Sequence, residues 1–429
     1  AKQELAPNKV EVINIATPNQ AGVSHNCYKE FSVSSAGLIL NNSKEAARSQ
    51  LGGMLMGNAN LSKSGTASLI INEVTGSQRS QINGFVEVHG KAADLVIANP
   101  QGISVNGGGF INVPRLTLTT GVPELNADGA LMNLFVNRGN ISIEAGGLNL
   151  QGCNYCDILA NTIKLNGAIE AQKVSDVGAE LRMVIGYYRF DYSKRQATQL
   201  PHPGRQIMGL DSAALGGMYA GKIYFQVKGG NVGVKMPVEM SANVGDIRVD
   251  ADGQISLGKS MQAKGDIQIQ AKGSLVGEDA QLKAGHSIEV QGKTVQLSEA
   301  KLSVGESLKL DANDQMRLTK SQLSAQAALN ICGSYVRVAQ SKLSSNKAMQ
   351  IKSNGALMFM NSSLWSGQAL NLESANDLQL SGIFLAQDNI HLMSGQALKS
   401  FGCLISLGGK IRVQSEGESV IRAQYFASK

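Results

Sequence analysis

The chain has 429 residues, more than a single compact core usually reaches, so two domains or one elongated repeat are expected. Its 48 glycines stand against only 8 prolines, which excludes a collagen-like chain, and 43% hydrophobic residues exclude a disordered one. The net charge of +6 comes from 39 basic and 33 acidic residues without a basic run, so nucleic acid is not an expected partner.

The N-terminal residues have neither the basic region nor the apolar stretch of a signal peptide, and no apolar run is long enough to span a bilayer. Either the chain is intracellular or a signal peptide has already been removed. Short segments that alternate apolar and polar residues follow, and they predict strands separated by turns. They include residues 10–15, 67–71, 85–88, 116–118 and 141–143. Residues 1–45 are the candidate for a cap, because the first coil of a stacked β-structure exposes unpaired backbone groups.

One segment of this half is unlike the rest. Residues 187–192 read Tyr-Tyr-Arg-Phe-Asp-Tyr, and Pro201 and Pro203 follow, which is too aromatic and too rich in proline for a regular coil. We therefore predict an extra-helical hairpin or loop near residues 186–210. The first domain, residues 1–240, holds every proline of the chain.

Residues 241–429 contain a repeat of 20 or 21 residues. A pair of apolar residues two apart recurs, beginning at Ile247, Ile267, Ile288, Leu308, Leu329, Met349, Leu370, Ile390 and Ile411. A second pair begins at Ile255, Val295, Met316, Val336, Leu357 and Leu378, and a single apolar position recurs at Leu282, Leu302, Leu323, Leu343, Leu364, Phe384 and Leu404. A spacing of two places both side chains of a pair on one face of a strand.

Three short strands per repeat, separated by turn residues, describe one coil of a parallel β-helix, in which equivalent residues stack about 4.8 Å apart. The consensus of leucine-rich repeats is missing, and the i, i+3, i+4 pattern of helical repeats does not recur. The sequence therefore predicts an all-β fold, a right-handed parallel β-helix with an N-terminal cap and an extra-helical hairpin or loop.

Six ordered blocks of the first domain resemble the secretion domain of two-partner-secretion exoproteins. They are residues 8–15, 37–43, 71–74, 96–103, 109–112 and 214–223. This domain is the haemagglutination-activity domain of filamentous haemagglutinins, large haemolysins and CdiA-type contact-dependent-inhibition proteins. The repeats that follow resemble the filament repeats of the same family.

The resemblance also implies a recognition site. The family motif Asn-Pro-Asn-Gly reads Asn-Pro-Gln-Gly at residues 99–102, and the second motif, after Asn-Glu-Val, is replaced by residues 77–84. An Asn-Pro pair followed by Gly is still a turn former. The residues implied in transporter recognition are Asn72, Glu73, Ser80, Gln81, Asn83, Gly84, Asn99, Pro100, Gln101 and Gly102. The alternative role for these residues is turn-making alone.

The resemblance implies an N-terminal secretion domain of a large surface exoprotein, which crosses the inner membrane by the Sec route and has lost its signal peptide. The polypeptide-transport-associated domains of a dedicated outer-membrane β-barrel would recognise it in the periplasm, and it would fold at the cell surface. The following repeats would begin a filament for contact-dependent growth inhibition or adhesion, with a target-cell receptor as a possible partner of the full-length protein. Neither enzymatic activity nor a cofactor is expected of this region.

Cys153 and Cys156 could form a redox pair, half of a metal site or a structural disulfide. For an exported chain we favour the disulfide, with two free thiols as the next possibility; similar pairs occur in some haemolysin-type members of the family. No other cysteine or histidine pair has the spacing of metal ligands, so no metal site is expected.

Two other classes of function are compatible with a β-helix. A polysaccharide-binding or polysaccharide-degrading enzyme, such as a pectate lyase or polygalacturonase, needs carboxylates clustered on one outer wall. The acidic residues here are sparse, and Asp250 and Asp252 form a close pair in the repeats. Direct adhesion, in which the outer wall binds glycans or a host protein, is the other alternative.

Overall fold

The computed structural model describes residues 2–172, 178–201, 208–212, 216–229, 232–422 and 424–427. These residues form strands joined by turns, with one short 3-10 helix, η1 (Ala59–Leu61). No helix in the described part of the chain has the length and apolar character needed to cross a membrane. The chain divides into two compact units, residues 1–244 and 245–429.

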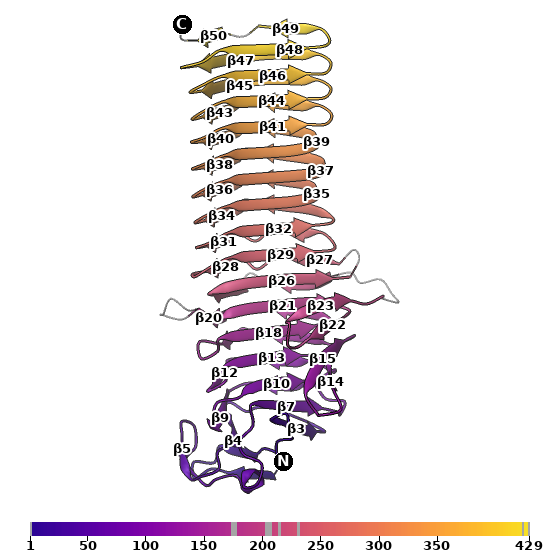
Figure 1. Ribbon diagram of the computed structural model, residues 1–429, viewed down its shortest axis with the longest axis vertical. Helices are drawn as coiled ribbons and strands as arrows, with labels where there is room; N and C mark the ends of the chain where they lie inside the picture. Colours follow the sequence, from indigo (N-terminus) through magenta and orange to yellow (C-terminus); the bar gives the residue numbers. More distant parts are fainter. Residues whose placement is uncertain are drawn as a thin grey trace. The chain divides into compact units, whose positions relative to one another are not determined.

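The second unit, residues 245–429, is a stack of coils in which strands pair in parallel from one coil to the next (Figure 1). The first apolar pair of each repeat lies in β29 (Ile247–Ala251), β32 (Ile267–Ala271), β35 (Ile288–Ser298), β37 (Leu308–Thr319), β39 (Leu329–Ala339), β41 (Met349–Ser353), β44 (Leu370–Ser374), β46 (Ile390–Ser394) and β48 (Ile411–Ser415). Pairing places Ile247 beside Ile267 and continues in register to Ile390 beside Ile411. The predicted apolar column is therefore confirmed.

The single apolar position forms a second column. It lies in β34 (Gln281–Ala284), β36 (Lys301–Val304), β38 (Gln322–Ala325), β40 (Lys342–Ser345), β43 (Ser362–Ser366), β45 (Leu378–Ala386) and β47 (Leu398–Ser406). Leu282 is beside Leu302, and the register continues to Phe384 beside Leu404. These side chains are buried, so stacked aliphatic side chains form the interior of the coils.

A serine ladder lines one corner of these coils. The amide N–H of Ser321 donates to Ser341 Oγ at 3.0 Å, and that of Ser341 donates to Ser362 Oγ at 3.3 Å. Lys320 and Gln340, the residues just before two of these serines, have φ of +49° and +51°. The left-handed backbone turns the chain sharply, and the buried hydroxyls satisfy amides that the turn removes from the strand ladder.

Truncating one member of the apolar column tests how far the stack depends on it. Leu329 is fully buried between Leu308 and Met349, so we expect Leu329→Ala to lower the free energy of unfolding by about 2–5 kcal/mol, through lost burial and a cavity. The matched control is Asn330→Ala on the opposite face, expected to cost under about 0.5 kcal/mol. Urea denaturation followed by circular dichroism measures both, and equal losses would contradict the stacked core.

The first unit, residues 1–244, also has three series of parallel strands. One series is β3 (Val23–Tyr28), β7 (Leu69–Val74), β10 (Asp94–Ala98), β13 (Arg115–Thr119), β18 (Tyr155–Ala160), β21 (Glu180–Gly186) and β26 (Lys222–Lys228). Another is β8 (Ser80–Ile82), β11 (Ile103–Val105), β16 (Asn140–Ile143), β19 (Thr162–Leu165) and β24 (Met208–Ser212). The last is β2 (Glu11–Asn14), β4 (Leu38–Asn42), β9 (Phe85–Gly90), β12 (Gly108–Ile111), β17 (Leu148–Asn149), β20 (Ile169–Ala171) and β25 (Gly217–Ala220). Each unit is thus a parallel β-solenoid.

The N-terminal end of this unit departs from the parallel pattern. Strand β1 (Lys2–Leu5) pairs antiparallel with β2, which pairs in parallel with β4 on its other side. A hairpin of β5 (Ala47–Ser49) and β6 (Gly53–Leu55) follows, just beyond the segment for which the sequence predicts a cap. Strand β1 occupies the edge that β2 would otherwise leave unpaired.

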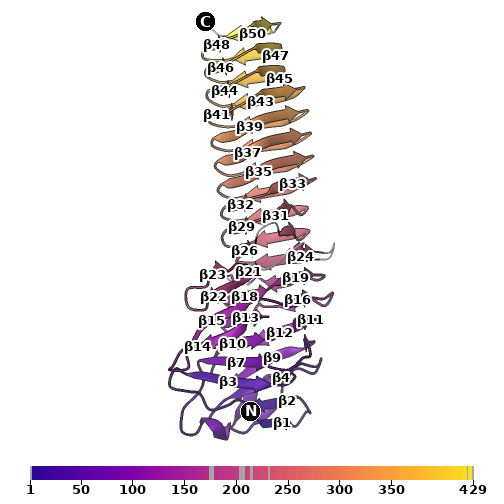
Figure 2. The same ribbon diagram turned by 90° about the vertical axis from the view of Figure 1, so that its right-hand side faces the viewer.

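A four-stranded antiparallel sheet lies at the side of the first unit (Figures 1 and 2). It consists of β14 (Val122–Leu125), β15 (Leu131–Val136), β22 (Tyr188–Asp191) and β23 (Gln196–Gln199). The last two strands lie in the segment for which an extra-helical element is predicted, of which residues 202–207 fall outside the described residues. The sequence analysis did not identify the other half, β14 and β15. Apolar residues of this side sheet pack on outward-facing residues of β7 and β10.

A buried ionic cluster fixes the side sheet to the solenoid. Asp157 of β18 is fully buried and accepts hydrogen bonds from Arg115 at 3.0 Å and from Arg195 at 2.7 Å. Arg195 lies in the β22–β23 turn and also donates to Glu180 at 2.7 Å. Burial lowers the pKa of Arg195, but the charges of Asp157 and Glu180 outweigh that effect and raise it. Arg195 therefore stays charged in the sheet-to-sheet interface.

Removing the central charge takes the carboxylate partner from Arg115 and leaves Arg195 with Glu180 alone. We expect Asp157→Asn to lower the free energy of unfolding by about 3–5 kcal/mol. The control is Lys259→Gln, which breaks an exposed pair with Asp279 and should cost about 1 kcal/mol or less. Both variants are compared by urea denaturation, and a loss at Asp157 no larger than that at Lys259 would show that the cluster does not hold the side sheet.

Candidate functional site

The residues implied in transporter recognition lie at two successive corners of the first unit. Asn72 and Glu73 lie at the end of β7, and residues 99–102 follow β10, which pairs directly with β7. Ser80 begins β8, and Ile103 of β11 is its partner in the next coil. The turns at 75–79 and 99–102 therefore stack on each other, while residues 83–84 form the next corner, between β8 and β9.

Asn99 organises the stacked corner. Its side-chain amide donates to the Gln78 carbonyl and to Ser80 Oγ, both at 2.9 Å, and its Oδ1 accepts from the Gln101 amide at 2.9 Å. The Gly102 amide closes the turn by donating to the Asn99 carbonyl, also at 2.9 Å. One fully buried amide thus joins its own turn to the turn of the preceding coil.

Both glycines of the motifs are required by backbone geometry. Gly102 has φ of +115°, and a Cβ there would lie 2.7 Å from the Asn140 carbonyl oxygen of the next coil. A Cβ at Gly84 would collide with the carbonyl oxygen of Ser34. Neither position accommodates a side chain unless the neighbouring backbone moves.

The ten residues divide by exposure. Gln81, Asn83 and Gln101 are exposed, and Pro100 and Glu73 are half-buried. The other five are buried: Asn72, Ser80, Gly84, Asn99 and Gly102. In the folded domain the exposed and half-buried residues can be reached by a partner, whereas the five buried residues cannot.

Arg79, which the sequence analysis did not single out, crosses the same corner. Its Nη2 donates to the Ile103 carbonyl at 2.8 Å, to Asn140 Oδ1 at 3.0 Å and to Ser142 Oγ at 2.6 Å. Burial lowers its pKa, and the nearby Glu144 carboxylate opposes that shift. An arginine in a turn gives no periodic signal, so only the stacking of coils identifies its partners.

A second buried polar group anchors the β5–β6 hairpin. The Glu87 carboxylate of β9 accepts from Ser49 Oγ at 2.6 Å and from the amides of Gln50 and Leu51 at 2.9 and 2.8 Å. His89, on the same strand and 2% exposed, has Nδ1 3.8 Å from Glu87. Burial lowers the pKa of His89, an effect that Glu87 only partly offsets.

The lowered pKa of His89 should make the stability of the protein depend on pH. In the unfolded chain His89 protonates near pH 6.5, whereas the folded chain keeps it neutral to lower pH. The free energy of unfolding should therefore fall as pH drops from about 6.5 towards the folded-state pKa of His89. Above pH 6.5 the histidine is neutral in both states and causes no loss of stability. Urea denaturation at pH 7.5 and 5.5 measures the loss, which His89→Gln should reduce. The exposed His286→Gln is the control, and an equal effect of both variants would contradict the assignment.

Cys153 and Cys156 lie together in the interior. Both are fully buried, and Cys156 begins the buried run of β18. Desolvation raises the pKa of the Cys156 thiol, and its neighbours Cys153 and Asp157 add to that shift. The environment is that of a structural rather than a reactive cysteine. Cys156 is a thiol in the structure, so the disulfide with Cys153 stays a prediction.

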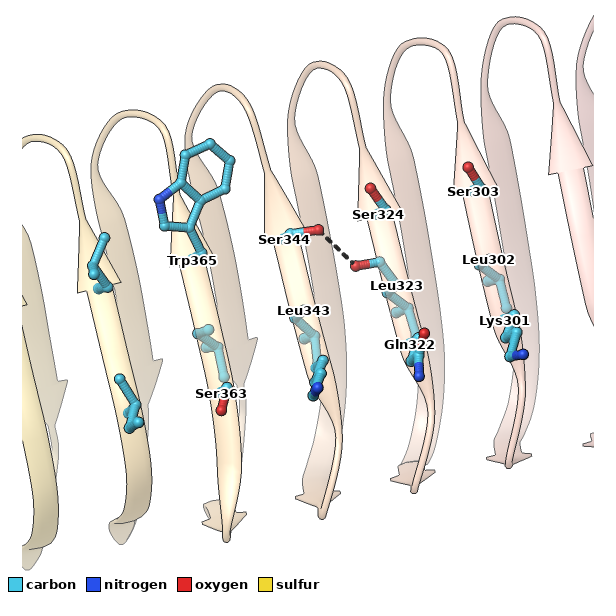
Figure 3. A pocket seen from close by; sticks show the side chains of 14 residues that line it. Lys301, Leu302, Ser303, Gln322, Leu323, Ser324, Leu343, Ser344, Ser363 and Trp365 are labelled. Atoms are coloured by element: carbon cyan, nitrogen blue, oxygen red, sulfur yellow. Dashed lines mark hydrogen bonds between the residues drawn. The ribbon is translucent and has the colours of Figure 1, made fainter.

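A groove of about 620 Å³ lies on the outer wall of the second unit (Figure 3). Ser303, Ser324 and Ser344 occupy equivalent positions on β36, β38 and β40, and Trp365 takes that position on β43. The small serines leave space beside the indole, which is 41% exposed. Among the described residues that line the groove, the titratable side chains are two lysines. The lining therefore lacks the carboxylate pair that glycosidic-bond cleavage uses.

Three side chains of metal-ligating type meet on the outer face of β3 and β7. His25 and Cys27 are two residues apart on β3, and Glu73, one of the implied recognition residues, lies opposite Cys27 on β7. His25 Nε2 is 2.7 Å from Glu73 Oε2 and 3.7 Å from Cys27 Sγ. Burial, followed by the charge of Glu73, raises the pKa of the Cys27 thiol. The spacing of two on a strand was not considered in the sequence analysis, which expected no metal site.

Comparison with known proteins identifies the family to which this chain belongs. The model of the TPS secretion domain matches residues 2–257, and the model of the hemagglutinin repeat matches residues 255–400. The chain belongs to the two-partner-secretion family. The crystal structure of a filamentous hemagglutinin secretion domain is similar to it, with 32% identity and a TM-score of 0.55, over 74% of this chain and 97% of that one. The resemblance deduced from the six blocks is therefore confirmed.

Relatives of this secretion domain are far longer than the chain. The 16S rRNA endonuclease CdiA of Enterobacter cloacae is 38% identical over 311 residues, which are 72% of this chain and 9% of that protein. The filamentous hemagglutinin of Bordetella pertussis is 38% identical over 270 residues, 62% of this chain and 7% of that protein. The chain thus spans less than a tenth of these two relatives, and their named activities are properties of the whole proteins.

Proposed function

We propose that this region directs export of a large surface exoprotein through a partner outer-membrane β-barrel of the two-partner type. The match of residues 2–257 to the TPS secretion domain carries this proposal. The polypeptide-transport-associated domains of the barrel would bind the chain after Sec transport into the periplasm. The repeats that follow would begin a filament, used by the full-length protein in contact-dependent growth inhibition or adhesion, with a target-cell receptor as a further partner.

The burial of the motif residues supports recognition before folding is complete. Asn99 and Ser80 are buried by the same hydrogen bonds that close their corner, so a partner could bind these side chains only while the corner is open. Gln101 and Asn83 remain exposed and could be recognised in either state. Coils that fold one on another outside the cell would then withdraw the binding motif and favour export.

The comparisons favour this function over a polysaccharide-degrading enzyme. The family match concerns a secretion domain, and the outer-wall groove offers lysines rather than a carboxylate pair. Direct adhesion by the outer wall is compatible with membership of this family, and it would take place after export.

Secretion of the 429-residue chain, preceded by a signal peptide, tests the proposal in cells with and without a cognate β-barrel. We expect the chain in the medium only when the barrel is present. Asn99→Ala should lower the secreted amount by about tenfold. The matched control is Asn112→Ala, because Asn112 is a corner amide outside the residues implied in recognition and donates to the carbonyls of Val88 and Gly90 at 2.8 and 3.0 Å. Urea denaturation of both purified variants shows whether they lose similar stability.

Two further outcomes are informative. An equal loss of secretion in both amide variants would assign Asn99 to turn-making alone, and a loss in Gln101→Ala would place recognition on the exposed side chain. Secretion that does not depend on the barrel would contradict the proposed function.

A further inference from the structure

We propose that His25, Cys27 and Glu73 form a binding site for a transition-metal ion of the Zn²⁺ class on the outer face of β3 and β7. The donor atoms His25 Nε2, Cys27 Sγ and Glu73 Oε2 come from residues whose ligand atoms all lie within 4.8 Å of one another. This inference is independent of the proposed export function, although Glu73 occurs in both.

The distance between the nitrogen and sulfur donors matches the one that a tetrahedral ion imposes. Zinc bonds of about 2.3 Å to sulfur and about 2.0–2.2 Å to nitrogen or oxygen, at tetrahedral angles, separate nitrogen from sulfur by about 3.6 Å. The observed separation of His25 Nε2 from Cys27 Sγ is 3.7 Å. The same geometry separates nitrogen from oxygen by about 3.4 Å, whereas His25 and Glu73 are 2.7 Å apart in a hydrogen bond. On metal binding, a small outward rotation of the Glu73 carboxylate would break that hydrogen bond, and bonds from both side chains to the ion would replace it.

The backbone presents the three side chains together without rearrangement. Alternation along β3 directs His25 and Cys27 outwards, while Ser24 and Asn26 between and beside them are buried. Parallel pairing places Cys27 directly beside Glu73. Inside, the Asn26 amide fixes β3 by accepting from the Ala16 amide at 2.9 Å. The two strands that carry the site are adjacent in both views (Figures 1 and 2).

The donor set selects the class of ion. One sulfur, one imidazole nitrogen and one carboxylate oxygen suit Zn²⁺ or Co²⁺, whereas Ca²⁺ and Mg²⁺ prefer oxygen ligands alone. Three protein ligands leave a fourth position, and the exposure of Cys27 opens that position to water or to a side chain of another molecule. A bound ion would also tie β3, the first strand of its series, to the next coil.

Titration of the full chain with Co²⁺ tests the site, because cobalt bound to a thiolate gives a charge-transfer absorption that other ligands do not produce. We expect one equivalent of Co²⁺ to develop this band and Zn²⁺ to displace it. Cys27→Ser should abolish the band, and His25→Gln and Glu73→Gln should each weaken binding by at least about tenfold. The matched control, Cys332→Ser, removes a cysteine of the second unit and should leave the band unchanged.

Thermal unfolding with and without Zn²⁺ provides a second readout. Zn²⁺ should raise the melting temperature of the parent chain and of Cys332→Ser, but not that of Cys27→Ser. Comparison of the metal-free melting temperatures shows whether each variant is folded. Absence of the cobalt band in the parent chain, its persistence in Cys27→Ser, or unchanged affinity in His25→Gln or Glu73→Gln would overturn the three-ligand site.

Discussion

In-register parallel pairing of successive coils is the constraint on which the rest of this protein depends. Each strand uses its backbone groups to bind the strand one coil earlier and one coil later, so equivalent residues of neighbouring coils must share one environment. The column that contains Ile247, Ile267 and Ile288 accordingly stays apolar from one coil to the next. The same rule stacks polar groups, and it produces the buried serine ladder of the second unit.

The first unit adds polar anchors to this regular framework. Asp157 holds the antiparallel side sheet by pairing with one arginine of the solenoid, Arg115, and one of the side sheet, Arg195. Glu87 holds the β5–β6 hairpin through three hydrogen bonds. Both carboxylates are buried and pair with groups from segments that leave the coils. An irregular segment cannot use the ladder of the solenoid, so a buried charge-assisted network fixes it instead.

In the proposed function, the residues of the motif corner would serve recognition before folding and structure after it. Asn99 is an interior amide that links two turns, so in the folded domain its polar atoms already have partners. Gln101, two residues later, points to solvent. In the proposed function, a partner that binds the open chain would compete for Asn99 with the solenoid that closes around the same turn, and folding would remove Asn99 from the partner.

The sequence by itself determined the coil. Period-two pairs repeated every 20 or 21 residues define strands, their inward faces and their register, because each repeat must bury its apolar residues against its neighbours. It also located the corner motifs and half of the side sheet. It did not identify β14 and β15, because Leu131–Val136 alternates much as a coil strand does.

Only the tertiary structure decided which polar residues meet. Asp157 and Arg195 are 38 residues apart, and Cys27 and Glu73 are brought side by side by one turn of the solenoid. Residues on successive coils have no fixed sequence separation in the first unit, because its corners carry insertions of different length. Their contacts follow from coil-to-coil register, which the local pattern of a single strand does not contain.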